Sequence, residues 1–311
     1  MEKHIEKGIA YTSLDALVRL RYKARGAWFR PFQPVETPLL GSHGSRLRGR
    51  GLNFEELRAY QLGDDIRTMD WKVTNRMKKP HVRVYTEERE RYVWLLVDQR
   101  LDMFFGSKVR MKSVAAAETA ALAAWRTLAD KDKVGGIVFN DHHQVPFKPQ
   151  RQPHAVTRLL GAVAGMNQEL RSGQGAQSSP EMLGRVLDKT LKLCSHDNLI
   201  LIISDMGGWN SSVLGQIKEL TRHNDVVVCL IFDPLEIKLP HMGRTVISNG
   251  WQQIEFDTHK KHIREAFERE FTTRFQDLQN RLKIYQVPVI PVDTTLPVQD
   301  QLYRTLNPNI S

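Results

Sequence analysis

Acidic side chains stand directly after two of the most apolar segments of this 311-residue chain. Asp98 ends the run that begins at Val93, Asp102 follows four residues later, and Asp205 directly follows the run 199 to 204. Carboxylate oxygens are the ligands that magnesium prefers in proteins. If the two segments end at the same edge of a sheet, Asp98, Asp102 and Asp205 predict a magnesium site and, as one alternative, a magnesium-dependent hydrolase.

An arginine between the first two carboxylates argues against the metal ion. The guanidinium of Arg100 carries a permanent charge and can form bidentate hydrogen bonds with a carboxylate. It can therefore neutralise the acidic side chains that a cation would need. We favour a polar network at these strand ends over a metal site, so no cofactor is expected and magnesium is the alternative.

From Tyr92 onward, apolar runs alternate with helical patterns. The predicted strands are 93–98, 134–139, 198–204, 226–232 and 286–290, and the predicted helices are 108–129, 154–163, 182–193, 213–223 and 259–282. Buried strands that alternate with helices predict an α/β domain over 92–311, with a doubly wound, mostly parallel sheet and helices on both faces. Asn249-Gly250 adds a predicted hairpin at one edge. Ligands of such folds bind beyond the carboxyl ends of the strands.

Residues 1–91 are more basic than the rest and form a predicted N-terminal extension. Residues 1–92 hold 19 Lys and Arg against 12 Asp and Glu, which favours a partner with an acidic surface. Arg46, Arg48 and Arg50 alternate with other residues near Trp28-Phe29, a pattern that can follow phosphates and stack on bases. Nucleic-acid binding is therefore an alternative, although we favour pairing of these arginines with protein carboxylates.

A charged block within this extension combines acidic and basic residues around one tryptophan. Its residues are Gly63, Asp64, Asp65, Ile66 and Arg67, followed by Asp70 and Trp71. Opposite charges three to four positions apart on a short helix, predicted for 65–77, are typical of a structural network rather than of a catalytic acidic cluster. We expect the block to dock the arm or form part of a partner surface, with Trp71 as an anchor.

Several classes of protein lack support in the sequence. The longest apolar runs are far shorter than the roughly 18 to 20 residues of a membrane-spanning helix, and the first residues lack a secretory signal, so we expect a cytoplasmic protein without a membrane span. Cys194 and Cys229 lie in apolar surroundings, which is typical of buried free thiols. No phosphate loop, HExxH or GxSxG motif accompanies the acidic residues.

The charged block and the strand that ends in Asp98 together resemble a bacterial family of unknown function, numbered 58, whose core is a von Willebrand factor A-like domain. In that fold an Asp-x-Ser-x-Ser motif, a later Thr and a later Asp bind a divalent cation. The first Asp corresponds to Asp98 and the last to Asp205, but Arg100 and Asp102 occupy the two Ser positions. Thr157 is the remaining candidate for the Thr. The resemblance therefore implies a degenerate metal-ion-dependent adhesion site.

The resemblance also implies a function without catalysis. Members of this family commonly stand beside AAA-type ATPases of the MoxR group, so it implies an adaptor that acts with such an ATPase in the assembly or activation of other complexes. The expected contact surface lies at the strand ends, where Arg100 would offer a salt bridge to a partner carboxylate. Its predicted residues are Asp98, Arg100, Asp102, Gly207, Gly208 and Trp209.

Overall fold

A computed structural model describes residues 10–24, 52–61, 63–87, 92–171, 178–205, 207–238, 244–248, 253–257 and 260–306. The chain forms two compact units. The smaller comprises residues 33–90, and the larger comprises the segments on either side of it. The predicted extension 1–91 is therefore divided between the two, since its first described residues, 10–24, belong to the larger unit.

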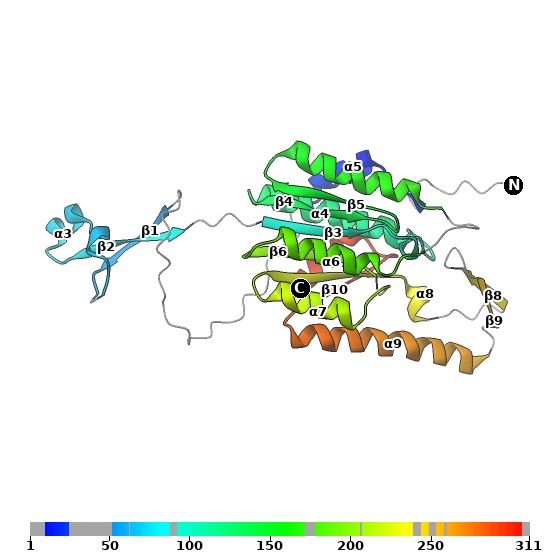
Figure 1. The fold of residues 1–311 in the computed structure, drawn as a ribbon. Helices are drawn as coiled ribbons and strands as arrows, with labels where there is room; N and C mark the ends of the chain where they lie inside the picture. Colours follow the sequence, from blue (N-terminus) through cyan, green and yellow to red (C-terminus); the bar gives the residue numbers. More distant parts are fainter. Residues whose placement is uncertain are drawn as a thin grey trace. The chain divides into compact units, whose positions relative to one another are not determined.

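The larger unit is built on a six-stranded sheet with the order β10-β7-β6-β3-β4-β5 (Figure 1). Its strands are β3 (Tyr92–Asp98), β4 (Lys133–Phe139), β5 (Gln144–Gln150), β6 (Asn198–Ser204), β7 (Asp225–Phe232) and β10 (Val289–Asp293). All neighbouring strands run parallel except β4 and β5. The chain first builds outward from β3 through β4 and β5, and then restarts on the other side with β6. This confirms the predicted doubly wound sheet and places its switch point between β3 and β6.

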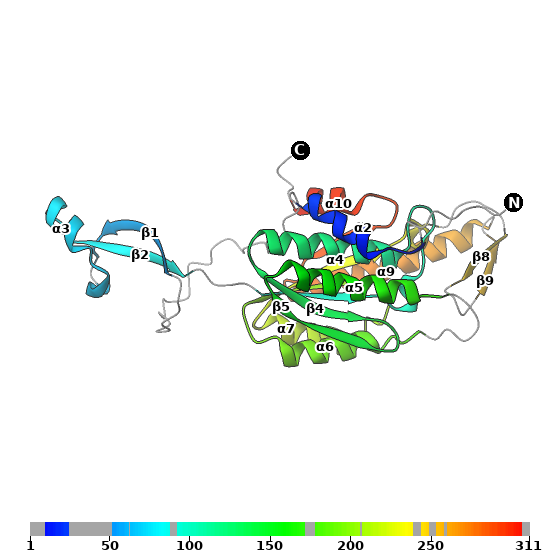
Figure 2. The same cartoon turned by 90° about the horizontal axis from the view of Figure 1, so that it is seen from above.

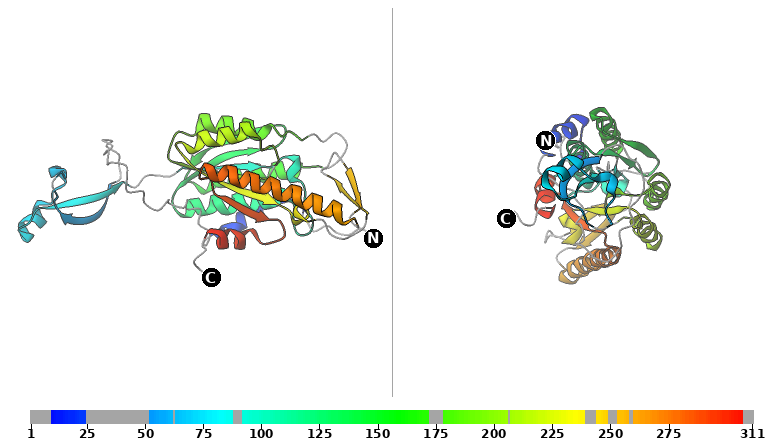
Figure 3. Two further views of the ribbon diagram at one scale, coloured as in Figure 1. Left: turned by 90° about the horizontal axis from the view of Figure 1, so that it is seen from below. Right: turned by 90° about the vertical axis from the view of Figure 1, so that its left-hand side faces the viewer.

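Helices cover both faces of this sheet. One face carries α2 (Leu14–Arg19), α4 (Lys112–Ala129), α5 (Pro153–Glu169) and α10 (Val298–Leu306), and the other carries α6 (Met182–Leu193), α7 (Ser211–Thr221) and α9 (Lys261–Ile284) (Figure 2; Figure 3, left). Successive residues of a strand point to opposite faces. Leu95 accordingly packs in the core beneath α4, whereas Leu96 packs in the core beneath α6 and α7.

The first described helix, α2, packs on α4 and α5. Ser13 caps it by accepting a hydrogen bond from the Ala16 amide. Leu17 is fully buried, and its carbonyl accepts a 3.1 Å hydrogen bond from Nε1 of Trp125 in α4. The side chain of Asn167 in α5 accepts a 2.7 Å bond from the Thr12 amide. These contacts make residues 11–19 part of the larger unit.

Additional short elements lie around the main sheet. They are the η1 turn (Leu20–Tyr22), the η4 turn (Leu101–Met103), α8 (Pro234–Ile237), β8 (Arg244–Ser248) and β9 (Gln253–Asp257). The antiparallel pair β8–β9 matches the predicted hairpin, although its turn at Asn249-Gly250 lies outside the described residues.

The smaller unit is an antiparallel pair, β1 (Leu52–Ala59) and β2 (His81–Glu87), joined through the η3 turn (Ile66–Thr68) and α3 (Trp71–Met77). The single short helix predicted for 65–77 is therefore wrong in detail. Met69 leaves the helical path and forms an isolated bridge with Val82, which separates η3 from α3.

The longest described helix, α9, has 24 residues and carries charged side chains along its length. Across the described part of the chain, no helix combines the length and apolar character that crossing a membrane requires.

Both cysteines are free and buried, as predicted, and burial raises the pKa of each thiol to about 12. We expect neither Cys194 nor Cys229 to react with an aromatic disulfide reagent at about pH 8 in the native protein, since the reactive species is the thiolate. Both should react at once in denaturant. The absorbance of the aromatic thiolate that the reagent releases gives the number of cysteines that have reacted. Rapid reaction of Cys229 in the native state would contradict its place between β6 and β10.

Candidate functional site

The carboxyl ends of β3 and β6 bring the predicted acidic residues to one edge of the sheet. The two strands are parallel neighbours in which Val97 pairs with Ile203. The residues that follow, Asp98 and Ser204, are therefore adjacent, and the Ser204 hydroxyl donates a 2.5 Å hydrogen bond to Oδ2 of Asp98. Asp205 comes next. The predicted convergence of Asp98 and Asp205 at the switch point is therefore present.

Arg100 folds back onto Asp98 and forms a fully buried ion pair with it. Both side chains have no exposed surface, and the guanidinium approaches the two carboxylate oxygens at 2.6 to 3.1 Å. A further terminal N–H of Arg100 donates a 2.9 Å hydrogen bond to the Gly207 carbonyl. Burial opposes the charge, but the carboxylates of Asp98, Asp205 and Asp102 outweigh it and raise the pKa of Arg100 above its ordinary value.

A second buried cation, which the sequence analysis did not identify, neutralises Asp205. Lys112 in the first turn of α4 is 3% exposed, and its ammonium lies 2.7 Å from Oδ2 of Asp205 and 2.7 Å from Oε1 of Glu236. Burial lowers the pKa of Lys112 and raises that of Asp205. Their mutual attraction is stronger, so the pKa of Lys112 is raised and that of Asp205 is lowered.

The donor set at this edge does not fit a divalent cation. Arg100 and Ser204 bind the carboxylate of Asp98, while Lys112 and the Gly207 amide bind that of Asp205. Two fixed positive charges therefore occupy the acceptors that magnesium would need. Within the described ranges, no three His, Cys, Asp or Glu side chains are grouped so that they could hold a metal ion.

Thr157, the candidate for the missing Thr, lies elsewhere. Its hydroxyl donates to the Pro153 carbonyl within the first turns of α5. Because β5 runs antiparallel to β4, α5 begins at the edge opposite to the strand ends that carry Asp98. The prediction for Thr157 is wrong, because the antiparallel edge strand reverses the direction of the chain before this helix.

The segment 178–180 covers the buried arginine. The Ser178 hydroxyl donates a 2.8 Å bond to Asp102, and the Pro180 carbonyl faces the Arg100 guanidinium at 3.4 Å. The Ser179 amide donates a 2.7 Å bond to Asp141, whose pKa is raised by burial. Residues 178–180 therefore belong to the site.

The predicted Gly207-Gly208-Trp209 turn lies beside this network. The Gly207 amide donates a 2.7 Å bond to Asp205, and the Trp209 indole N–H donates a 2.7 Å bond to the Asp205 carbonyl. Gly208 has a φ of 83°, and a Cβ at this position would lie 2.4 Å from the Pro180 carbonyl oxygen. The turn thus depends on glycine for both its conformation and its close packing.

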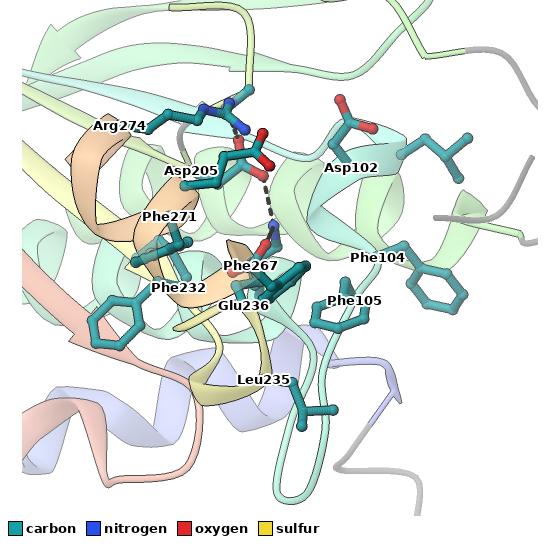
Figure 4. A pocket seen from close by; sticks show the side chains of 15 residues that line it. Asp102, Phe104, Phe105, Asp205, Phe232, Leu235, Glu236, Phe267, Phe271 and Arg274 are labelled. Carbon is teal, nitrogen blue, oxygen red and sulfur yellow. Dashed lines mark hydrogen bonds and ion pairs between the residues drawn. The ribbon is translucent and has the colours of Figure 1, made fainter. Parts of the chain in front are cut away.

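An aromatic cavity of about 370 Å³ opens next to the buried ions (Figure 4). Its walls include five phenylalanines, Phe104, Phe105, Phe232, Phe267 and Phe271, all half-buried. Lys112, Asp205 and Glu236 also line it, and α9 contributes Glu270 and Arg274. Phe267, Glu270, Phe271 and Arg274 recur every three or four residues, so they occupy one face of α9. The sequence analysis missed this cavity because its walls come from five separate segments.

The predicted contact residues differ in accessibility. Asp102, Gly207, Gly208 and Trp209 are partly exposed, whereas Asp98 and Arg100 have no exposed surface. A direct salt bridge from Arg100 to a partner, as predicted, is not available in this conformation because Asp98, Gly207 and segment 178–180 enclose the guanidinium. Asp98 and Arg100 instead shape the surface formed by their neighbours.

The carboxylates of the charged block are structural. Arg58 and the Gln61 amide bind Asp64, and Arg83 binds Asp70; in each case the arginine lowers the pKa of the carboxyl group. Asp65 caps η3. The structural interpretation thus accounts for all three carboxylates. Trp71 is 66% exposed, and its role as an anchor stays a prediction. Arg46, Arg48, Arg50, Trp28 and Phe29 lie outside the described residues.

Comparison with models of protein families shows which family this chain belongs to. The family model described as "Protein of unknown function DUF58" matches residues 56–276, more than half of the chain. The chain belongs to this family. Relatives described as uncharacterized proteins occur in Mycobacterium tuberculosis and Mycobacterium bovis; each is 26% identical over 274 residues, which cover 84% of this chain and 81% of the relative.

Solved structures with a similar arrangement include two bacterial proteins. The conserved hypothetical protein BatB from Bacteroides thetaiotaomicron is 15% identical and covers 70% of this chain and 98% of its own, with a TM-score of 0.40. A von Willebrand factor type A protein from Catenulispora acidiphila is 12% identical and covers 72% of this chain and 43% of its own, with a TM-score of 0.34. The strand order of this DUF58 chain itself, rather than these likenesses, defines the fold described above.

Replacing Lys112 tests the second buried ion pair. Lys112→Met should lower the free energy of unfolding by about 3 to 5 kcal/mol, because it leaves buried carboxylates without their cation. Lys112 lowers the folded pKa of Asp205, so its contribution is present above the ordinary pKa of aspartate and is lost as the pH falls through the folded value. Urea unfolding should therefore show the largest difference from the natural protein near neutral pH and a smaller one in acid. Adding Asp205→Asn should restore part of the loss; equal losses at all pH values would contradict the assignment.

The Gly208 turn allows a matched pair of substitutions. Gly208→Ala should destabilise the protein by about 1 to 3 kcal/mol, because the new methyl group meets the Pro180 carbonyl in a left-handed conformation. Gly165→Ala in α5 is the control, since nothing lies within 4 Å of its added Cβ and alanine favours a helix by about 1 kcal/mol. Urea unfolding measures both. Equal stability of the two variants would contradict the tight packing at Gly208.

Proposed function

We propose that this chain is a protein–protein interaction module of the von Willebrand A type that acts without a bound metal ion and without catalysis. The observation that carries the proposal is the pair of buried cations at the strand ends. Arg100 and Lys112 supply, from within the chain, the positive charge that a divalent ion supplies in metal-dependent members of this fold. The edge of the sheet is thereby kept in one arrangement whether or not an ion is present.

The aromatic cavity is the recognition element of this proposal. Aromatic and arginine side chains contribute most of the binding energy at many protein interfaces, and this cavity combines five phenylalanines with Arg274. It is large enough for one or two apolar side chains of a partner. Asp102, Glu270 and Arg274 add charges at its lining that can orient the partner. The buried ion pairs beside the cavity keep Asp102 and the Gly207 turn in place.

We assign the partner to the MoxR-type AAA ATPases, on the basis of the resemblance between this chain and proteins that stand beside such ATPases. In this proposal the strand-end surface binds the ATPase and couples it to a target complex. The apolar cavity and the neutralised carboxylates support recognition more than turnover, since catalysis by carboxylates requires one that is free to exchange a proton or bind an ion. A magnesium-dependent hydrolase at Asp98, Asp102 and Asp205 is the alternative that the experiments must separate.

Metal independence is tested on the chain alone. Saturating magnesium or manganese should leave the melting temperature unchanged, because an ion that binds only the native state would raise it by mass action. Lys112→Met is the variant to compare in the same measurement. Removal of the lysine cation frees a carboxylate oxygen of Asp205 to bind an ion, so the melting temperature of this variant should rise with either ion. A rise in melting temperature of the natural protein with either ion, or hydrolysis of a phosphate ester that Asp98→Asn abolishes, would overturn the proposal.

Partner binding is tested with the purified MoxR-type ATPase from the same genome. Phe271→Ser should weaken binding by about tenfold or more, as expected for a central aromatic contact, in isothermal titration calorimetry. Ile284→Ser is the matched control, because Ile284 is 75% exposed at the far end of the same helix. Unchanged binding by Phe271→Ser would exclude the cavity as the contact, and absence of binding by the natural protein would exclude the ATPase as the partner.

A further inference from the structure

The smaller unit exposes large apolar side chains. Ile66 is 60% exposed, Trp71 is 66% exposed and Met77 is 55% exposed. Tryptophan is large and apolar, so leaving it in water loses the favourable free energy that burial would provide. These residues belong to the charged block and the short helix that follows it, outside the site at the strand ends.

The aspartates of the block hold two of these apolar residues outward. Asp65 caps η3 by accepting a bond from the Arg67 amide, and Ile66 is the first residue of that turn. Asp70 caps α3 by accepting bonds from the Lys72 and Val73 amides, and Trp71 is the first residue of that helix. A capping aspartate therefore precedes an exposed apolar residue in both places; Asp70 is buried, whereas Asp65 is itself exposed.

Arg83 strengthens the second arrangement. Its guanidinium binds the other carboxylate oxygen of Asp70 at 2.7 to 2.8 Å, which ties the start of α3 to β2. Asp70 is 8% exposed, whereas Trp71 next to it is 66% exposed. The backbone that carries Trp71 is thus held from two sides, and its side chain is displayed on a fixed support. Such preorganisation lowers the cost of binding.

Basic residues line the same hollow as Trp71. A hollow of about 560 Å³ is lined by Trp71, Thr74, Asn75, Lys78, Lys79 and Pro80, which we call the Trp71 surface. Trp71 and Thr74 are three residues apart on α3 and therefore share one face, and Lys78 follows the helix in a left-handed conformation. No described acidic side chain forms an ion pair with Lys78 or Lys79, and both are exposed. The surface therefore combines an apolar centre with unneutralised positive charge.

We propose that the Trp71 surface binds an acidic segment of a partner protein, with an apolar side chain of that segment on Trp71 and its carboxylates on Lys78 and Lys79. The charges are complementary to such a segment, and the aromatic ring provides the contact that most often dominates binding energy. The hollow itself is lined by two lysines around an apolar centre, which suits a short acidic segment that carries an apolar side chain. This site is separate from the strand-end cavity and does not depend on the function proposed for it.

The test uses the full chain and a displayed library of random peptides as the probe. Selected peptides should be acidic and contain at least one aromatic or long aliphatic residue. Fluorescence anisotropy should show that Trp71→Ala weakens their binding by about tenfold or more. Lys78→Glu with Lys79→Glu should abolish binding, and salt should weaken binding to the natural protein. Circular dichroism of each variant checks that the fold is intact.

Matched controls separate this surface from the rest of the chain. Ile284→Ser removes an exposed apolar residue from the larger unit, and Lys192→Glu with Lys283→Glu reverses two exposed lysines there. These variants and Phe271→Ser should bind the selected peptides as the natural protein does. The proposal would be overturned if Trp71→Ala bound the selected peptides as tightly as the natural protein does, or if the selected peptides were basic or uncharged.

Two further measurements address other occupants. Single-stranded DNA could compete with the selected peptides for this surface. If the DNA bound more tightly than any peptide, and Lys78→Glu with Lys79→Glu abolished its binding, the surface would be assigned to nucleic acid. A photoreactive amino acid in place of Asn75, an exposed residue that lines the same hollow, would assign the surface to an internal contact if it cross-linked within the same chain in dilute protein. Either result would overturn the proposal, whereas cross-linking to the selected acidic peptide supports it.

Discussion

The arrangement of the strand-end edge depends on one buried ion pair. Arg100 and Asp98 are both inaccessible to water, so each needs the other to offset the large cost of burying a charge. Because the guanidinium also binds the Gly207 carbonyl and faces that of Pro180, the same arginine connects β3 to the turn after β6 and to the segment before α6. Removing one partner would leave a charge in a place where no water can reach it.

Lys112 extends this constraint to the other half of the edge. Its bonds to Asp205 and Glu236 join α4, the end of β6 and α8. The two cations thus neutralise carboxylates that approach from different strands, and the aromatic cavity lies against them. The polar network and the cavity are parts of one structure, because Lys112, Asp205 and Glu236 belong to the ion pairs and also line the cavity.

The smaller unit applies the same physical principle at its surface. Its aspartates cap the short helices or form ion pairs with Arg58 and Arg83, and the apolar residues beside the capping aspartates are exposed to solvent. In both units the acidic residues organise backbone, and their neighbours remain available for contacts.

The sequence by itself determined the alternation of strands and helices, the position of Asp98 and Asp205 at strand ends, and the presence of a fixed positive charge, Arg100, beside the first of them. These follow from apolar period and from residue type, which are local properties. Only the tertiary structure decided that Lys112 reaches Asp205 from 93 residues away, that Thr157 lies at the opposite edge, and that Trp71 faces solvent. The physical reason is that long-range pairing and burial depend on which elements pack together, and no spacing along the chain specifies the partner of a charged side chain or the face that remains uncovered.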